Sequence, residues 1–477
     1  MPKIKLKSKV EKPSNTTNLK SPIHAMYANK LDEMEKKFNI TSQSFTTPGR
    51  LSSGMLVMDM VYSGGLTAGA MFQVSGLEKG GKTTSCMTFL ASALQSNIPI
   101  LEVWDVENAM NDPTHVENII KQKISNVFYS KPPRARLYQE AVLEDFYNSS
   151  KFLMRSVPDK LYSNEAKGWH FVFDADKIGR EKLSDFGFSN TSYDKNLFRS
   201  TGRLWVPVEK EDEGIQGIIF CDSYPALVTE AEDENDENSK AMALDARAFS
   251  KNIKKIAGIL KKKAFVVFGV NQIRENPAAR MSSPFYEPGG AALRFNSSLR
   301  VRNMPRAVPQ GWPQGIKADG GKTSAYGDEP SVIKKGRMDR YAYVMMENTK
   351  SKLGTPFLSS MMRIWISDHR GKSQGYDPVF DTYQYLKMTE RLKGGIASFT
   401  ISVGPLEGKK IKWQDFKALI LAETMQDSTL TERYMKDIGL SKPLLLRKML
   451  FKEIINKTAF DMVNTGSKGN SEDLEED

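Results

Sequence analysis

The sequence predicts an α/β protein with a mostly parallel sheet flanked by helices. Two patterns support this prediction. Short apolar runs recur along the chain and end in polar or acidic residues, and a glycine-rich loop joins one of them to a run suited to a helix. The composition agrees, because 26% charged and 40% hydrophobic residues over 477 positions are typical of a soluble chain with two or three domains.

The glycine-rich loop extends from Gly76 to Thr84 and fits the phosphate-binding pattern of Gly, four residues, then Gly-Lys-Ser/Thr. The residues before it predict a buried strand, and Thr83 to Leu94 predict a helix. Glycines let backbone N–H groups converge on a phosphate, and the helix N-terminus adds positive charge. We expect Lys82 to bind the β- and γ-phosphates of ATP and the Thr83 hydroxyl to bind Mg²⁺. The other ATP-binding positions of the loop are Gly76, Glu78, Lys79, Gly80, Gly81 and Thr84. A glycine turn without a ligand is the alternative, and the fit of both flanks argues against it.

Two further apolar strands end in acids. The strand predicted over 98–104 is followed by Glu107, on the side of an open α/β sheet where ligands bind. Glu107 is therefore a candidate to position and deprotonate the attacking water, although by itself it would be read as a capping or salt-bridged acid. The next strand, over 217–221, ends in Asp222, which we expect to hold Mg²⁺ directly or through water.

A fourth buried strand, over 264–270, is followed by Gln272. An uncharged amide at this place can donate a hydrogen bond to a γ-phosphate and lose it on hydrolysis. Residues 275–288 then predict a long loop closed by Gly289 and Gly290. A loop of this length on a nucleotide site is seldom without function.

Two insertions interrupt the rhythm of strands and helices. Residues 160–213 predict an inserted lobe with a small β element. His170 within it reads as a surface or packing residue, because no second metal ligand stands at a suitable spacing. Residues 308–335 predict a polar, Gly-rich insertion, whose Gly321-Lys322-Thr323 resembles a phosphate loop but has Ile316 where the first glycine belongs.

Both ends of the chain differ from its middle. Residues 1–45 predict a basic arm, either solvated or touching DNA, and a short amphipathic helix over 25–38. Residues 404–470 predict a small, basic, mostly helical domain, and residues 471–477 an acidic tail.

Charge and cysteine content say less about the partners and the location of the protein than the motifs do. A net charge of +11 favours a polyanionic partner but decides nothing alone. Cys86 and Cys221 lie in apolar stretches and predict buried, reduced thiols. With no apolar run long enough to span a membrane, these features predict a cytoplasmic protein.

Several blocks of the chain, in this order and spacing over roughly residues 46–403, resemble RecA-family recombinases. They are Gly76 to Thr84, Asp105-Val106-Glu107-Asn108-Ala109, Asp112-Pro113, Cys221-Asp222-Ser223, Leu244-Asp245-Ala246-Arg247, Lys255-Ile256-Ala257-Gly258, Asn271-Gln272-Ile273-Arg274, Gly289-Gly290-Ala291-Ala292-Leu293-Arg294-Phe295, Lys350-Ser351-Lys352 and Thr355-Pro356-Phe357. In its divergence and insertions the chain is most similar to phage RecA/UvsX-like proteins. The phosphate loop is generic, whereas Asn-Gln-Ile-Arg followed by a loop and Gly-Gly-x-Ala-Leu-Arg-Phe is specific.

The resemblance implies a RecA-like ATPase core over 46–403, an N-terminal oligomerisation helix and a small C-terminal domain. It implies that Glu107 activates water and that Gln272 senses the γ-phosphate and relays this to the following loop, which binds single-stranded DNA. The acidic stretch after Glu230 would be the first DNA loop. Further implied contacts are Asp112 and His115 with adenine, Lys350 and Lys352 with the ATP of a neighbouring subunit, and Arg247, Ser250, Lys254, Arg274, Gly289 and Gly290 with DNA. His115 replaces the aromatic residue usual in the family.

The implied function is ATP-dependent homologous recombination. The protein would form a helical filament on single-stranded DNA, pair it with duplex DNA, exchange strands and hydrolyse ATP, served by loading and single-strand-binding proteins in the cytoplasm, that of the host if phage-encoded. A hexameric DNA helicase on the same core and a non-catalytic DNA-coating scaffold stay open as alternatives. Lys350-Ser351-Lys352 and the Gly-Gly block favour the recombinase over the helicase, and the complete set of chemical residues argues against the scaffold.

Overall fold

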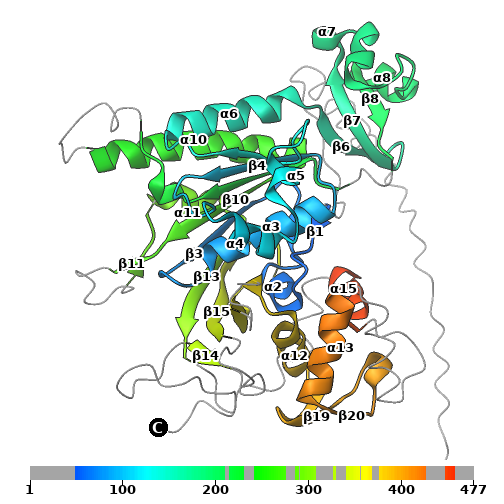
Figure 1. The fold of residues 1–477 in the computed structure, drawn as a ribbon. Helices are drawn as coiled ribbons and strands as arrows, with labels where there is room; N and C mark the ends of the chain where they lie inside the picture. The colour runs from blue at the N-terminus through cyan, green and yellow to red at the C-terminus, as the bar shows by residue number, and fades with distance from the viewer. Residues whose placement is uncertain are drawn as a thin grey trace, which may run out of the picture. The chain divides into compact units, whose positions relative to one another are not determined.

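In a computed structural model of the chain, the described residues are 49–209, 214–229, 241–275, 285–288, 290–307, 326–328, 340–354, 356–367, 375–425 and 446–456 (Figure 1). They fall into two compact units, one of residues 161–207 and one of all the others. The predicted N-terminal arm, most of the insertion at 308–335 and the acidic tail lie outside the described residues. Within the described residues, no helix combines the length and apolarity that a bilayer span requires.

The larger unit is organised around a 10-stranded sheet. Its order is β17-β16-β15-β13-β3-β10-β9-β4-β5, with β14 paired to β15. The strands are β3 (Met71–Gly76), β4 (Ile100–Asp105), β5 (Arg136–Tyr138), β9 (Gly217–Asp222), β10 (Phe265–Gln272), β13 (Leu299–Arg306), β14 (Tyr326–Asp328), β15 (Arg340–Ser351), β16 (Ser359–Ser367) and β17 (Gly375–Tyr376). Pairing is parallel from β13 through β3, β10, β9 and β4 to β5, and antiparallel from β13 to β17. The predicted mostly parallel sheet is therefore present, with an antiparallel extension.

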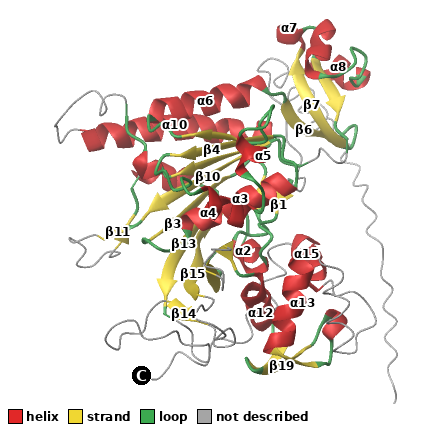
Figure 2. Cartoon of the chain, viewed as in Figure 1, coloured by secondary structure: helices red, strands yellow, loops and turns green. Residues whose placement is uncertain are grey.

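Helices cover both faces of this sheet (Figure 2). They are α3 (Lys82–Gln95), α4 (Pro113–Ile120), α5 (Ile124–Phe128), α6 (Leu143–Ser156), α10 (Ala241–Lys263) and α11 (Gly290–Asn296). In β9, Ile218 and Phe220 join the core beneath α3, whereas Ile219 and Cys221 join the core beneath α6 and α10. This alternation follows from the two-residue period of a strand. Because both faces are covered, the parallel strands are continuous apolar runs.

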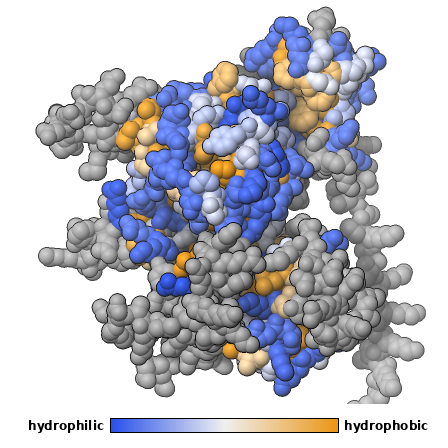
Figure 3. All heavy atoms as spheres, viewed as in Figure 1, coloured by the Kyte–Doolittle hydropathy of each residue, from blue (hydrophilic) through white to orange (hydrophobic). Residues whose placement is uncertain are grey.

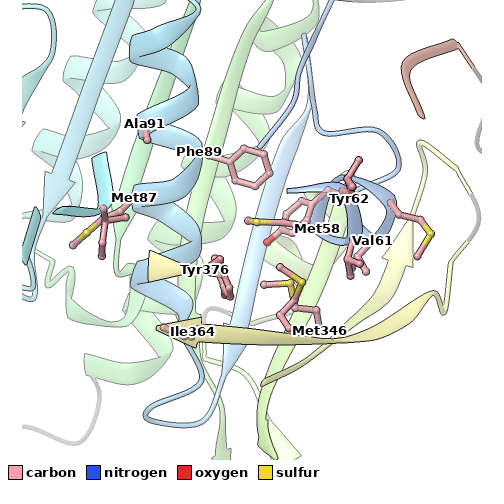
Figure 4. Close-up of a cluster of buried hydrophobic side chains, with 14 of the residues drawn as sticks. Met58, Val61, Tyr62, Met87, Phe89, Ala91, Met346, Ile364 and Tyr376 are labelled. Atoms are coloured by element: carbon pink, nitrogen blue, oxygen red, sulfur yellow. The ribbon is translucent and has the colours of Figure 1, made fainter. Parts of the chain in front are cut away.

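The core on the α3 face extends to α2 (Leu56–Val61), as Figure 4 shows. Tyr62, which follows α2, meets Phe89 of α3 edge to face, with ring centroids 5.0 Å apart. Aromatic pairs in this geometry add about 0.5–1.5 kcal/mol beyond area burial. Cys86 and Cys221 are both buried and free, as predicted.

The chain after the central sheet folds onto α2. Its elements are α12 (Pro378–Met388), β18 (Leu392–Gly395), β19 (Ser398–Ile401), β20 (Lys410–Lys412), α13 (Trp413–Met425) and α15 (Leu446–Asn456). Strands β18, β19 and β20 form one antiparallel sheet, so the boundary expected near residue 404 falls inside it. The buried Arg447 of α15 forms an ion pair with Asp381 of α12, whose carboxylate also accepts the N–H groups of Leu56 and Val57. This network ties the C-terminal helix to the start of α2.

The smaller unit overlaps the predicted insertion at 160–213. A 3-stranded sheet of β6 (Asp159–Ser163), β7 (Gly168–Asp174) and β8 (Arg203–Pro207) is joined by α7 (Ala175–Ile178), η1 (Arg180–Phe186) and α8 (Lys195–Thr201). Its buried apolar residues form two small clusters of its own, one around Trp205 and one around Phe173. We call residues 161–207 the lobe.

The remaining short elements are β1 (Arg50–Leu51) paired with β2 (Leu66–Thr67), β11 (Arg274–Glu275) paired with β12 (Phe285–Tyr286), η3 (Tyr224–Ala226) and η5 (Gly404–Leu406). On the face drawn in Figure 3, the described surface is mainly hydrophilic. Large apolar side chains such as Phe152 and Phe295 are exposed singly, which is normal for a globular surface.

Candidate functional site

The phosphate loop connects β3 to α3, as predicted. Its backbone requires glycine at two places. Gly81, at the N-cap of α3, has a left-handed φ of 70°, and a Cβ there would lie 2.4 Å from Ile364 Cδ1. A Cβ on Gly76 would lie 2.1 Å from the carbonyl oxygen of Asn303. Any side chain at either position would displace the loop from β13 or β16.

Lys82 is the first residue of α3. Its Nζ donates a hydrogen bond of 2.9 Å to the Leu77 carbonyl, so the ammonium group lies across the loop. Burial lowers the pKa of Lys82, while the charges of Asp222, Glu107 and Glu78 oppose that shift. A cation that is desolvated and held by a single carbonyl is well prepared to bind an anion in its place.

Asp222 ends β9 and is fully buried. Among the described residues, neither of its carboxylate oxygens has a hydrogen-bond partner of normal geometry, although the Thr83 hydroxyl lies close enough to lower its pKa. Burial raises the pKa of Asp222 to about 7 against this influence, and the nearby charges of Glu107 and Asp105 raise it further. A buried carboxylate without a partner is costly unless a cation neutralises it.

These oxygens fit Mg²⁺. Carboxylate and hydroxyl oxygens are the ligands that Mg²⁺ prefers, and in nucleotide sites the ion takes one or two protein ligands and completes its shell with phosphates and water. Thr83 and Asp222 supply that number. Among the described residues, no group of three or more His, Cys, Asp or Glu side chains could hold a metal without such help.

Glu107 lies just beyond β4, in a turn held by Asp105, whose carboxylate accepts the N–H groups of Ala109 and Met110. The Glu107 Oε1 atom accepts hydrogen bonds from Gln272 Nε2, at 2.8 Å, and from the Ser223 hydroxyl. The Glu107 side chain is otherwise exposed. The structure therefore brings together two residues that were predicted separately, Glu107 and Gln272.

Gln272 reaches Glu107 because of the strand order. It ends β10, which pairs in parallel with β3, and the register places Gln272 beside Gly76. The N–H of Ile273 donates to the Gly76 carbonyl at 3.2 Å. The start of the segment after β10 is thus bonded to the first glycine of the phosphate loop.

The two residues predicted at adenine lie at the start of α4. Asp112 is the N-cap of this helix, and its carboxylate accepts the N–H of Thr114 at 2.9 Å. His115 follows on the first turn and is half-buried. Asp112 therefore has a capping role of its own, which the sequence analysis did not foresee.

Lys350 and Lys352 lie at the other end of the sheet from the phosphate loop of their own chain. The N–H of Lys352 donates to Ser298, which is bonded in turn to Met71 at the start of β3. Both ammonium groups donate to the Phe295 carbonyl at the C-terminus of α11, at 3.1 and 2.7 Å. Burial lowers the pKa of Lys350 to about 8, and the charges of Lys352 and Arg300 add to the effect. The pair does not complete the phosphate site within one chain.

The predicted DNA contacts are placed in part. Lys254 is exposed on α10 and Arg274 is exposed in β11. Arg247 and Ser250 belong to α10, and Gly290 begins α11. Gly289, the acidic stretch at 230–240 and residues 276–284 lie outside the described residues.

Comparison with known proteins bears on this arrangement. A sequence profile of the RecA N-terminal domain matches residues 211–309, which include Asp222 and Gln272. Protein RecA of Thermus thermophilus is 24% identical over 332 residues, 69% of each chain. Protein RecA of Gloeothece citriformis is 25% identical over 251 residues, 53% of this chain and 51% of that protein. Over these stretches the chain is similar to RecA proteins.

Two further similarities are local or distant. Protein RecA of Acholeplasma laidlawii is 38% identical over 104 residues, 21% of this chain and 31% of that protein. The crystal structure of the RadB recombinase aligns with a TM-score of 0.35 and 13% identity over 67% of this chain and 97% of that one. The chain spans about half the length of the Gloeothece RecA, and the likeness to phage proteins stays a prediction.

Three residues of this site were missed by the sequence analysis. Ser223 bonds to Glu107, and the Tyr376 hydroxyl contacts the Gly81 carbonyl at 3.1 Å and the Ser85 hydroxyl at 2.9 Å. Glu287 bonds to β3, which leads into the phosphate loop. Ser223 could have been suspected from its place after a strand-end acid, whereas no local pattern singles out Tyr376 or Glu287.

Proposed function

We propose that this protein is an ATP-dependent recombination protein that forms helical filaments on single-stranded DNA. In these filaments it pairs the strand with homologous duplex DNA, exchanges strands and hydrolyses ATP in a DNA-stimulated manner. The observation that carries the proposal is the 2.8 Å hydrogen bond between Gln272 and Glu107. It connects the candidate base to the residue from which the candidate DNA-binding segment begins.

The chemistry follows from the positions of three side chains. Mg²⁺ held by Thr83 and Asp222 would neutralise part of the phosphate charge. Lys82 exchanges its bond to the Leu77 carbonyl for the β- and γ-phosphates. Glu107, exposed beside the phosphate loop, accepts a proton from the attacking water.

Gln272 acts as the sensor. Its amide now donates to Glu107, and a γ-phosphate would compete for the same N–H groups. Exchange between these two acceptors moves the end of β10, from which the segment 275–288 starts. ATP would thereby strengthen DNA binding by this segment, and linkage requires that DNA strengthens ATP binding by the same factor. Such coupling typically amounts to about 1–3 kcal/mol.

Assembly follows from the position of Lys350 and Lys352. Since both lie away from the phosphate loop of their own chain, we assign them to the ATP of a neighbouring subunit in the filament. A second copy is then needed for full activity. The DNA contacts assigned to this filament are Arg247, Ser250, Lys254, Arg274, Gly289 and Gly290, with duplex DNA entering during exchange and with loading and single-strand-binding proteins as partners.

Electron microscopy with ATP, Mg²⁺ and single-stranded DNA is the first test. We expect helical filaments, whereas closed rings would support the hexameric helicase and overturn the proposal. A strand-exchange assay with a labelled strand then compares homologous with unrelated duplex DNA. Exchange only with homologous duplex is the expected result.

The relay is tested by Gln272→Ala. We expect this variant to keep its basal ATP hydrolysis but to lose most of the stimulation by single-stranded DNA, because the connection between base and segment is gone. Lys254→Ala is the matched control, since it removes a DNA contact and leaves the relay intact, so excess DNA should restore its stimulation. Unchanged stimulation in Gln272→Ala would contradict the proposed relay between Glu107 and the segment 275–288.

Salt dependence tests whether phosphate contacts dominate DNA binding. With about six phosphates neutralised, affinity should fall roughly 10³-fold between about 50 and 200 mM salt. A flat dependence would contradict phosphate-led binding. An absence of DNA-stimulated hydrolysis at any salt concentration would favour the scaffold.

A further inference from the structure

The segment after β10 leaves the sheet and returns to it at one place. Strand β11 pairs antiparallel with β12, joining Arg274 to Tyr286 and Glu275 to Phe285. Glu287 and Pro288 follow directly and precede α11. The two ends of the segment 275–288 are therefore held side by side.

Glu287 is bonded to the two strands beside the phosphate loop. Its Oε2 accepts a hydrogen bond of 2.8 Å from Gln73 Nε2, and its Oε1 accepts one of 2.9 Å from the Ser75 hydroxyl. Arg300 of β13 forms an ion pair with the same carboxylate. The side chains of Arg300 and Glu287 are only 11% and 9% exposed. A buried carboxylate with three partners is held in one geometry, because each lost bond would leave a buried polar group unsatisfied.

A second bond holds the same end of the segment. The buried Asn271 donates from Nδ2 to the Pro288 carbonyl at 3.0 Å, and its Oδ1 accepts the N–H of Gln272 at 2.9 Å. Asn271 thus joins the end of the segment to the residue at its start. Glu287 joins the same end to β3, between Gln73 and Ser75, just before Gly76.

We propose that Glu287 is a positioning residue that anchors the C-terminal end of the segment 275–288 to β3 and so couples single-stranded DNA binding at this segment to the nucleotide site. Because β3 ends at Gly76, the bonds that Glu287 accepts from Gln73 and Ser75 connect this end of the segment to the phosphate loop. This connection is separate from the hydrogen bond between Gln272 and Glu107 at the other end of the segment. This inference rests on the proposed function of the segment as a single-stranded DNA site.

The chain offers a way to separate the charge of Glu287 from its anchoring role. The sheet register pairs Arg300 with Gln73, so a carboxylate at position 73 lies beside the same guanidinium. Q73E/E287A therefore keeps Arg300 neutralised without an anchor. In Q73E/E287Q, the amide at position 287 can donate to the carboxylate at position 73. The hydrogen bond between the two positions is then re-formed with donor and acceptor exchanged.

The experiment compares wild type, E287A and the two double variants. Thermal unfolding reports folding, and the DNA concentration at half-maximal ATPase stimulation reports the coupling. We expect E287A to unfold at lower temperature. Q73E/E287A should unfold like wild type yet need about 10- to 100-fold more single-stranded DNA, the factor expected for a lost hydrogen bond to a charged group. In Q73E/E287Q the requirement should return to within about threefold of wild type, since the bond is re-formed.

Hydrogen exchange in the absence of DNA judges the anchor independently of the proposed function. We expect peptides covering 285–290 to exchange faster in Q73E/E287A than in wild type and Q73E/E287Q. Equal exchange in all four proteins, or wild-type DNA coupling in the stable Q73E/E287A, would overturn the inference. A wild-type protein without DNA stimulation would refute the proposed function, and the exchange data would still decide whether Glu287 anchors the segment.

Discussion

Polar groups beside the phosphate loop and polar groups in the lobe differ in how completely they are hydrogen-bonded. Within the part of the chain that the structure describes, neither oxygen of the buried Asp222 has a hydrogen-bond partner of normal geometry, and the Leu77 carbonyl is the hydrogen-bond partner of Lys82. In the lobe, Asp194 caps α8 through two N–H groups, and Arg203 is paired with Asp174. At the phosphate loop, Asp222 and Lys82 are therefore groups for which a ligand can supply the missing partner.

His170 of the lobe extends this contrast. His170 is buried, its Nδ1 lies 2.9 Å from the Gly168 carbonyl, and its ring packs against Trp205. Burial lowers the pKa of His170, which favours the neutral ring. The packing role expected for His170 from the sequence agrees with this environment. The polar groups described in the lobe are bonded to one another and to the backbone, as structural groups are.

Removing the charge of Lys82 should have the largest effect. We expect Lys82→Ala to lower ATP hydrolysis by about three orders of magnitude, because no other cation replaces it at the phosphates. Lys177→Ala in the lobe, which breaks an exposed pair with Asp174, is the matched control and should stay within about twofold. Phosphate release measures both variants, and a loss below about tenfold in Lys82→Ala would contradict the comparison.

Removing the base should come next. Glu107→Gln keeps an oxygen for Ser223 and Gln272 but cannot take a proton, so turnover should fall about 10²- to 10⁴-fold. Binding of a fluorescent ATP analogue and of single-stranded DNA should persist. Parallel losses of binding and turnover would show that Glu107 holds the site together and is not its base.

The pH dependence of assembly should show a smaller effect at Lys350. Its pKa is lowered to about 8, so the side chain is charged below that pH and loses its proton above it. Phosphate binds the charged form, and ATP-dependent assembly should therefore be constant below pH 8 and weaken by up to about tenfold per pH unit above it. Lys350→Arg, which stays charged, should remove this decline in light-scattering assays. A decline of the same steepness in the Arg variant would assign it to another group.

The lobe should show the smallest effect on activity. Trp205→Ala removes a buried side chain from a cluster that lies within the lobe, and large-to-small changes of this kind cost about 3–5 kcal/mol. We expect faster hydrogen exchange over 161–207 with ATP hydrolysis within about twofold of wild type. A tenfold loss of hydrolysis would show that the lobe supports the nucleotide site.

The sequence predicted best what depends on neighbouring residues. The helix expected over 83–94 is Lys82–Gln95, and the strand expected from residue 264 is Phe265–Gln272, because glycine turns and long apolar runs act locally. Shorter and more polar elements, including α4 and β5, were not predicted. Their form depends on packing against the sheet more than on local pattern.

By itself, the sequence determined the phosphate loop, the apolar strands and the acids that end them, since each follows from residue type and spacing within a few turns of chain. Only the tertiary structure decided which strand ends are neighbours. The order β3-β10-β9-β4 joins Gln272 to Glu107 and Asp222 to Thr83, and chain closure brings Glu287 to Gln73 and Tyr376 to Gly81. These contacts depend on strand pairing between segments as much as 295 residues apart, and the pairing is selected by burial of the whole core.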